Sequence, residues 1–274
     1  MTATVLDGVL ASLAAGCATG VGALPAFFFR SVPDRVMNTM LGAAAGVMLA
    51  ATSFSLIVPG IDAGAELWGM RWAVAAVVGG MLAGAVFLDL ADRYLPQEHL
   101  VLYDGGLDRH EGPASKLRKI WLFIIAVTIH NLPEGLAVGV GYGAVGSEAA
   151  PAERVAELLH NARALAIGIG LQNMPEGLAV ALPLVGLGYS RGAAVLIALA
   201  TGLVEPLGAL LGAGAVTYFR PMLPIGLGFA AGAMLFVISD EIIPETHSHG
   251  KSRLATFGVL IGFVIMMSMD NLLG

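Results

Sequence analysis

The chain has 274 residues, of which 57% are hydrophobic and 12% charged, and its formal net charge is −6. Soluble domains carry about 25% charged residues, so this composition excludes an ordinary soluble protein. The modest negative charge gives no sign of nucleic-acid binding. The single cysteine, Cys17, cannot form a disulfide within one chain.

Apolar stretches of about 20 residues recur along the whole length, and each is long enough to cross a hydrocarbon core of about 30 Å as a helix. We therefore expect an all-α polytopic membrane protein, with residues 1–274 forming a single transmembrane domain. The eight expected spans are roughly 5–29, 38–61, 72–92, 118–143, 162–185, 190–217, 222–243 and 254–273.

The Lys and Arg residues in the connections predict the orientation, because cytoplasmic loops are enriched in them. With the N-terminus outside, ten lie in inside loops (Arg30, Arg35, Arg93, Arg109, Lys116, Arg118, Lys119, Arg191, Lys251 and Arg253) and four in outside loops (Arg71, Arg154, Arg163 and Arg220). We therefore expect both termini to be extracytoplasmic, in the cell membrane, and the polar loop 93–117 to be cytoplasmic.

The fourth and fifth spans carry a repeated motif. Residues 131–138 read NLPEGLAV and residues 173–180 read NMPEGLAV, so seven of eight positions match. Since one connection separates these spans, they run in opposite directions and bring the motif into the membrane from both sides. Inverted repeats whose helices are interrupted by Pro or Gly around a midplane site are typical of secondary transporters.

The fourth, fifth and sixth spans each contain one glutamate beside a proline: Glu134, Glu176 and Glu205. A carboxylate at the bilayer centre costs about 3 kcal/mol on insertion scales, so it marks a functional site. His130 precedes Glu134 by four residues, and Gln172 precedes Glu176 by four, which places each pair on one helix face. Each proline also leaves a backbone carbonyl one turn earlier without its helical partner.

The ligand types indicate which cation such a site prefers. Carboxylates with one imidazole suit Zn²⁺, Fe²⁺ or Mn²⁺. The absence of a thiolate cluster argues against Cu⁺, and an all-oxygen Ca²⁺ or Mg²⁺ site would not need His130. Taken singly, His130, Asn131 or Gln172 is explained by hydrogen bonds between helices, but the repeated set predicts a metal centre.

Further acidic and histidine side chains lie at span ends. They form either a metal relay at the entrance or exit, or simply a solvated end. The residues are Asp62 and, in the run SDEIIPETHSHG over 239–250, Asp240, Glu241, Glu245, His247 and His249.

HNLPEG (130–135) and QNMPEG (172–177) closely resemble the ZIP family of divalent metal transporters, in particular its bacterial GufA-like branch. The resemblance extends over all eight spans and includes VMLAATSFSLIVPGID (47–62), EPLGAL (205–210) and AAGAMLFVISDEIIPET (230–246). It implies eight helices in an inverted 3+2+3 repeat arrangement. It also implies an elevator-like mechanism, in which spans 1, 4, 5 and 6 slide against spans 2, 3, 7 and 8, often in a homodimer.

The resemblance further implies a binuclear metal centre between spans 4, 5 and 6, touched by span 2. Members of this branch commonly have Asp where this chain has Asn173, which removes a negative charge from the second site. The first metal would meet Met48, His130, Glu134, Gln172, Glu176 and Glu205, and the second Asn131, Glu134, Asn173, Glu176 and Glu205.

We therefore expect a membrane carrier that imports a divalent metal, with Zn²⁺ as the expected ion, into the cytoplasm, and with no cofactor beyond the transported ion. The alternatives are a carrier of broad specificity for Cd²⁺, Fe²⁺ and Mn²⁺, or a metal-gated channel or sensor. An intramembrane metalloprotease is disfavoured, because its helix motif needs Glu after the first His and His130 is followed by Asn131. Besides the metal ion, the expected partners of the carrier are the lipid bilayer and a second copy of the chain.

Overall fold

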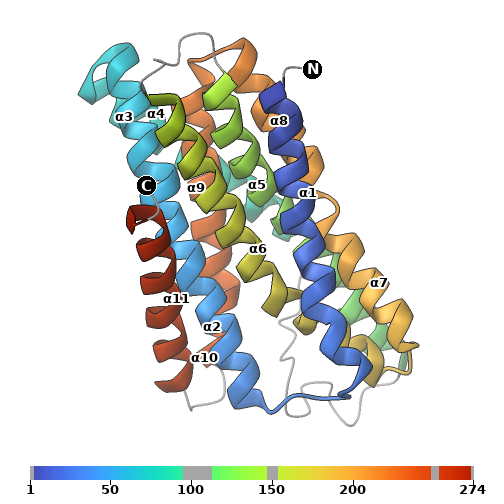
Figure 1. The fold of residues 1–274 in the computed structure, drawn as a ribbon. Helices are drawn as coiled ribbons and strands as arrows, with labels where there is room; N and C mark the ends of the chain where they lie inside the picture. The colour runs from blue at the N-terminus through green and yellow to red at the C-terminus, as the bar shows by residue number, and fades with distance from the viewer. Residues whose placement is uncertain (1–2, 95–112, 147–153, 248–252, 273–274) are drawn as a thin grey trace.

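The computed structural model describes residues 3–94, 113–146, 154–247 and 253–272, and this part of the chain is helical, with no strand (Figure 1). Eight helical segments in it are long and apolar enough to cross a membrane, which confirms the predicted all-α polytopic fold. They are Ala3–Phe27, Asp34–Trp68, Met70–Arg93, Ile120–Gly146, Val155–Gly186, Arg191–Tyr218, Met222–His247 and Arg253–Leu272.

Several of these spans are built from more than one helical piece. Spans 2 and 7 each contain a π-helical segment, named η2 and η4, and span 6 is divided into α7 and α8. In chain order the elements are α1 (Ala3–Ala23), η1 (Leu24–Phe27), α2 (Asp34–Ala50), η2 (Ala51–Ile57), α3 (Val58–Trp68), α4 (Met70–Tyr94), α5 (Pro113–Gly146), α6 (Val155–Gly186), α7 (Arg191–Gly202), α8 (Glu205–Tyr218), α9 (Met222–Val237), η4 (Ile238–Ile242), α10 (Ile243–His247) and α11 (Arg253–Leu272).

The way the helices pair agrees with an inverted 3+2+3 arrangement. The most extensive packing joins α1 to α6, α5 to α8, α2 to α11 and α4 to α9. Exchanging span 1 with 6, 2 with 7, 3 with 8 and 4 with 5 converts the first pair into the second and the third into the fourth. The two π-helical segments also lie at equivalent places under this exchange, before Pro59 in span 2 and before Pro244 in span 7.

Glycine allows the two motif helices to approach their partners closely. A Cβ atom on Gly135 would lie 2.0 Å from the carbonyl oxygen of Glu205, and one on Gly177 would lie 1.8 Å from that of Thr19. Any side chain would therefore separate α5 from α8, or α6 from α1. The glycine that follows each motif glutamate thus keeps that glutamate next to a neighbouring helix.

The bundle has two distinct ends in Figure 1. The N-terminal end of α1, helix α3 and α8 lie at the upper end, whereas α7 and α10 lie at the lower end. The expected boundary of span 2 at residue 61 placed Asp62 just after the helix. Helix α3 instead extends this span to Trp68, so Asp62 lies within it. Span 7 likewise continues through α10 to His247.

Candidate metal centre

Helices α5 and α6 carry the repeated motif, and both continue through their motif prolines, Pro133 and Pro175. Neither motif proline ends its helix. The interruption lies in span 6, where α7 ends at Gly202 and α8 begins at Glu205, next to Pro206. Glu205, the first residue of α8, is fully buried, and its carboxylate faces Asn173 of α6.

Amide side chains of α6 donate hydrogen bonds to the motif carboxylates of α5 and α8. The amide nitrogen of Gln172 donates a hydrogen bond to Oε1 of Glu134, which joins α6 to α5. Nδ2 of Asn173 donates to Oε1 of Glu205 at 2.6 Å and to the carbonyl oxygen of Ala15 at 2.9 Å. The repeated motifs are thus brought together with α8 and α1 around one buried polar cluster.

Several polar atoms of this cluster are buried without a hydrogen-bond partner among the residues that the structure describes. A buried polar atom without a partner costs about 1–3 kcal/mol, so a group of them indicates a ligand site. Glu134 also lies within electrostatic range of both Glu176 and Glu205. The atoms are both amide atoms of Asn131, Glu134 Oε2, Gln172 Oε1, Asn173 Oδ1 and Glu205 Oε2.

Met48, the residue of span 2 expected at this centre, is 2% exposed on α2. It belongs to an extended apolar core cluster that also includes Val138 of α5 and Ile169 of α6, and α2 itself packs against α6. Its side chain is therefore part of the buried core.

A cavity of about 80 Å³ opens from the cluster toward the lower end of the bundle. Its polar lining consists of His130, Glu134 and Glu176, together with Glu241 of η4 and Glu245 of α10, and the rest of the lining is apolar. Because the loops on this side are those predicted to be cytoplasmic, the cavity leads from the cluster toward the predicted cytoplasm.

A second group of possible metal ligands adjoins this cavity. Nε2 of His130 lies 3.1 Å from Glu241 and 3.8 Å from Asp92, and one ligand atom from each residue lies within 4.8 Å of the others. Glu241 was among the residues predicted from the sequence, whereas Asp92 was not. The available signal was its place in FLDLADRY, one turn after Asp89, at the end of an otherwise apolar span.

The other residues of the predicted relay are not gathered at this group. Asp240 is exposed on η4. His247 lies 3.0 Å from the carbonyl oxygen of Ile243 through Nδ1 and 3.2 Å from the Thr256 hydroxyl through Nε2, so both ring nitrogens have local partners. His249 lies outside the described residues.

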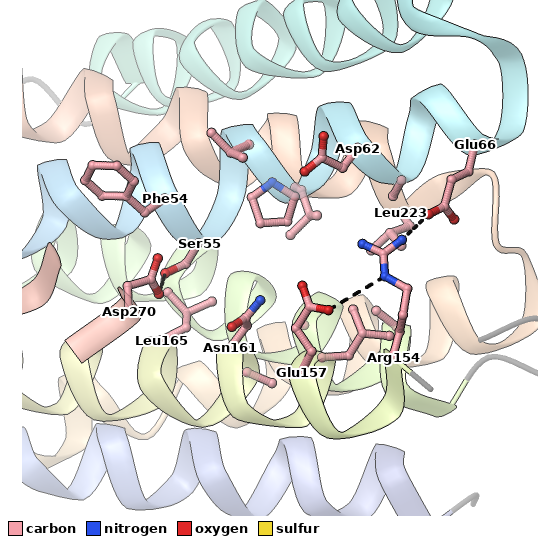
Figure 2. A pocket seen from close by; sticks show the side chains of 18 of the residues that line it. Phe54, Ser55, Asp62, Glu66, Arg154, Glu157, Asn161, Leu165, Leu223 and Asp270 are labelled. Atoms are coloured by element: carbon pink, nitrogen blue, oxygen red, sulfur yellow. Dashed lines mark hydrogen bonds and ion pairs between the residues drawn. The ribbon is translucent and has the colours of Figure 1, made fainter. Parts of the chain in front are cut away.

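A larger cavity of about 450 Å³ lies at the upper end, and Figure 2 shows its polar lining. At one side the hydroxyl of Ser55 donates to Asp270 at 2.8 Å. At the other, Arg154 reaches from the start of α6 to Glu66 at the end of α3. Asp62 lies in this upper cavity, well away from Glu241 and Glu245 in the lower one.

Comparison with known proteins gives an assignment that agrees with this geometry. Residues 104–270 match the family described as ZIP Zinc transporter. The chain is 44% identical to "Zinc transporter ZIPB" of Bordetella bronchiseptica, over 97% of this chain and 81% of that protein. It is 42% identical to "Zinc transporter GufA" of Myxococcus xanthus, over 97% and 99% of the two chains.

The similarity extends to animal proteins. "Zinc transporter ZIP11" of Homo sapiens is 38% identical over 93% of this chain and 94% of its own length. These relatives are named as transporters, which confirms the prediction of a carrier and not an enzyme. The matches extend over nearly the whole chain and include both motif helices and the segments that line the lower cavity. The chain belongs to the ZIP zinc transporter family.

Proposed function

We propose that this protein is a membrane carrier that imports Zn²⁺ into the cytoplasm through the polar cluster between α5, α6 and α8. The observation that supports it most is a set of buried oxygen atoms on Glu134, Gln172, Asn173 and Glu205 that have no hydrogen-bond partner within the described part of the chain. Carboxylate oxygens are zinc ligands, and a nearby imidazole adds a nitrogen. The names of the relatives support zinc as the transported ion.

The proposed ligands come from four spans. Glu134, Glu176 and Glu205 supply the charge, and His130 and Gln172 supply neutral donors. Met48, buried on α2, would add a soft thioether ligand, which extends the range of acceptable ions toward Cd²⁺. The carboxylate oxygens and the imidazole of the same set also suit Fe²⁺ and Mn²⁺. Asn131 and Asn173 complete the cluster.

The proposed route runs from the upper cavity to the lower one. Asp62 and Asp270 would attract the cation at the upper end, which the positive-inside rule places outside the cell. From the centre, His130 would pass the ion to Asp92 and Glu241, and Glu245 lies further along the same cavity. The lower cavity reaches Glu134 and Glu176, which supports assigning this structure to an inward-facing state of the proposed cycle.

An elevator-like movement is the proposed way of alternating access. Helices α1, α5, α6, α7 and α8 would move against α2, α3, α4, α9 and α11. The packing supports this division, because the most extensive contacts, α1 with α6, α5 with α8, α2 with α11 and α4 with α9, all lie within one group or the other. We further propose a cell-membrane location, extracytoplasmic termini and a homodimer, which multi-angle light scattering in detergent would test.

Zinc uptake into proteoliposomes tests the proposal. The wild type is expected to show saturable uptake, and Glu176→Ala is expected to lose it while inserting normally. Asp7→Asn, which removes an exposed charge on α1, serves as the matched control and should retain uptake. Zinc binding without saturable flux in the wild type would instead favour a sensor, and non-saturating flux would favour a channel.

A further inference from the structure

The two motif asparagines occupy equivalent positions in the repeat but have different surroundings. Asn131 and Asn173 are both fully buried, at 0% exposure. Asn173 uses both amide hydrogens, one toward Glu205 and one toward the carbonyl of Ala15. Neither amide atom of Asn131 has a hydrogen-bond partner in the described part of the chain. The repeat is therefore asymmetric at this position.

The contacts of Asn173 require an amide and not a carboxylate. Both of its neighbours, the Glu205 carboxylate and the Ala15 carbonyl, only accept hydrogen bonds, so the NH₂ group must face them. A carboxylate here would bring acceptor oxygens against acceptor oxygens at 2.6 and 2.9 Å. Such an arrangement needs a proton or a second cation between them, because adjacent buried like charges are costly.

Glu205 is consequently held by one oxygen only. Its Oε1 accepts from Asn173 and lies beside Gly16 of α1, where a Cβ atom would come within 3.4 Å of it. Its Oε2 has no hydrogen-bond partner among the described residues. One oxygen of Glu205 is thus fixed by the protein, and the other is available to a metal.

We propose that Asn173 is a positioning residue whose amide hydrogens replace a second cation beside Glu205, so that the centre carries one zinc ion at a time. The proposal rests on the zinc-carrier function above, and it departs from the binuclear centre that the family resemblance implies. It assigns Asn173 to holding Glu205 in place and to joining α6 to α1, and not to binding a metal through its nitrogen.

Zinc stoichiometry provides the test. Purified protein in detergent is equilibrated with zinc by dialysis, and bound zinc is measured by elemental analysis. The same measurement on the triple variant Glu134→Ala/Glu176→Ala/Glu205→Ala is subtracted, which removes zinc bound at His247 and other sites. After this subtraction, we expect one bound zinc ion per chain for the wild type and two for Asn173→Asp. Asn131→Asp, with no amide bond to lose, should remain at one.

Each result decides the proposal. A difference of two for the wild type, or of one for Asn173→Asp, would overturn it. Two zinc ions in both Asp variants would also overturn it, because added charge alone would then recruit the metal. If Asn173→Asp does not fold, Asn173→Ala gives a second measurement: loss of both hydrogen bonds should weaken zinc binding about tenfold, and unchanged affinity would contradict the positioning role.

Uptake by the same preparations separates the two proposals. A difference of two in a wild type that takes up zinc saturably overturns only the one-ion inference. A difference of zero together with no uptake overturns the carrier function, and the inference with it.

Discussion

Nε2 of His130 lies 3.1 Å from a carboxylate oxygen of Glu241, so the first motif helix contacts span 7 at the inner end of the lower cavity. The equivalent position of the second motif is Gln172, which donates to Glu134 inside the centre. Two positions related by the repeat therefore have different partners. Only the α5 side leads toward Asp92 and Glu241, which gives the centre a direction.

Removing the charge of Glu241 tests this link. Glu241→Gln is expected to slow zinc uptake about tenfold with little effect on zinc binding at the centre, because His130 loses the partner that receives the ion. Asp240→Asn removes the same charge from the neighbouring, exposed residue and should have a much smaller effect. The initial rate of zinc uptake is measured in proteoliposomes for both variants. Equal rates for Glu241→Gln and Asp240→Asn would contradict the role of Glu241.

The close approach of α6 to α1 depends on Gly177. Gly177→Ala places a methyl group within 1.8 Å of the Thr19 carbonyl, a backbone atom that cannot move without shifting α1. Overpacking of this kind costs about 1–3 kcal/mol, so a lower apparent melting temperature in detergent is expected. Gly186→Ala, on the same helix with nothing within 4 Å of the added carbon, is the control. Equal melting temperatures for both variants would show that the helices separate freely.

Glu66 accepts hydrogen bonds from Arg154 and Arg220, and these contacts lie at the rim of the upper cavity. Since all three side chains are partly exposed, the pairs together contribute only about 1 kcal/mol. Loss of this free energy in Glu66→Gln should therefore raise the access of water-soluble reagents to the cavity about fivefold.

Labelling of Asn161→Cys, introduced with Cys17→Ser, by a water-soluble thiol reagent measures this change. Glu157→Gln leaves both contacts of Glu66 in place and serves as the control. Identical labelling rates in the Glu66 and Glu157 variants would show that these ion pairs do not restrict the upper cavity.

Protons should compete with zinc at the centre. Zinc binds deprotonated carboxylates and neutral imidazole, so its affinity is expected to rise from pH 5 to pH 8 and to fall on acidification. Protonation of Glu134, Glu176 or Glu205 would then favour release of the ion. Isothermal titration calorimetry across this range measures the effect. An affinity that does not change with pH would exclude proton-assisted release.

The sequence predicted the eight spans because apolar length determines whether a helix can cross a membrane. It also predicted that Glu134, Glu176 and Glu205 lie near one another, because a carboxylate in the hydrocarbon core is costly unless it has a partner there. Asp92, Asp270 and Glu66 were missed because carboxylates at span ends are common. Only the packing of distant spans brings them to His130, Ser55 and Arg154.

The sequence does not indicate which of the three prolines beside a glutamate accompanies a helix break. The prolines of the two motifs lie inside continuous helices, because α5 and α6 run through Pro133 and Pro175. The break lies in span 6 before Glu205, where α7 ends at Gly202 and α8 starts with a proline at its second position. Proline is readily accommodated in the first turn of a helix, so its position relative to the helix start matters more than its presence.

The location of bound zinc tests the central claim most directly. A crystal of the wild type soaked with zinc, measured at the zinc absorption edge, is expected to show an anomalous peak about 2.0–2.2 Å from carboxylate oxygens of Glu134 and Glu176. The peak should disappear in Glu134→Ala. Zinc found only at the lower group of Asp92, His130 and Glu241, or only at His247, would contradict a transport centre formed by the repeated motifs.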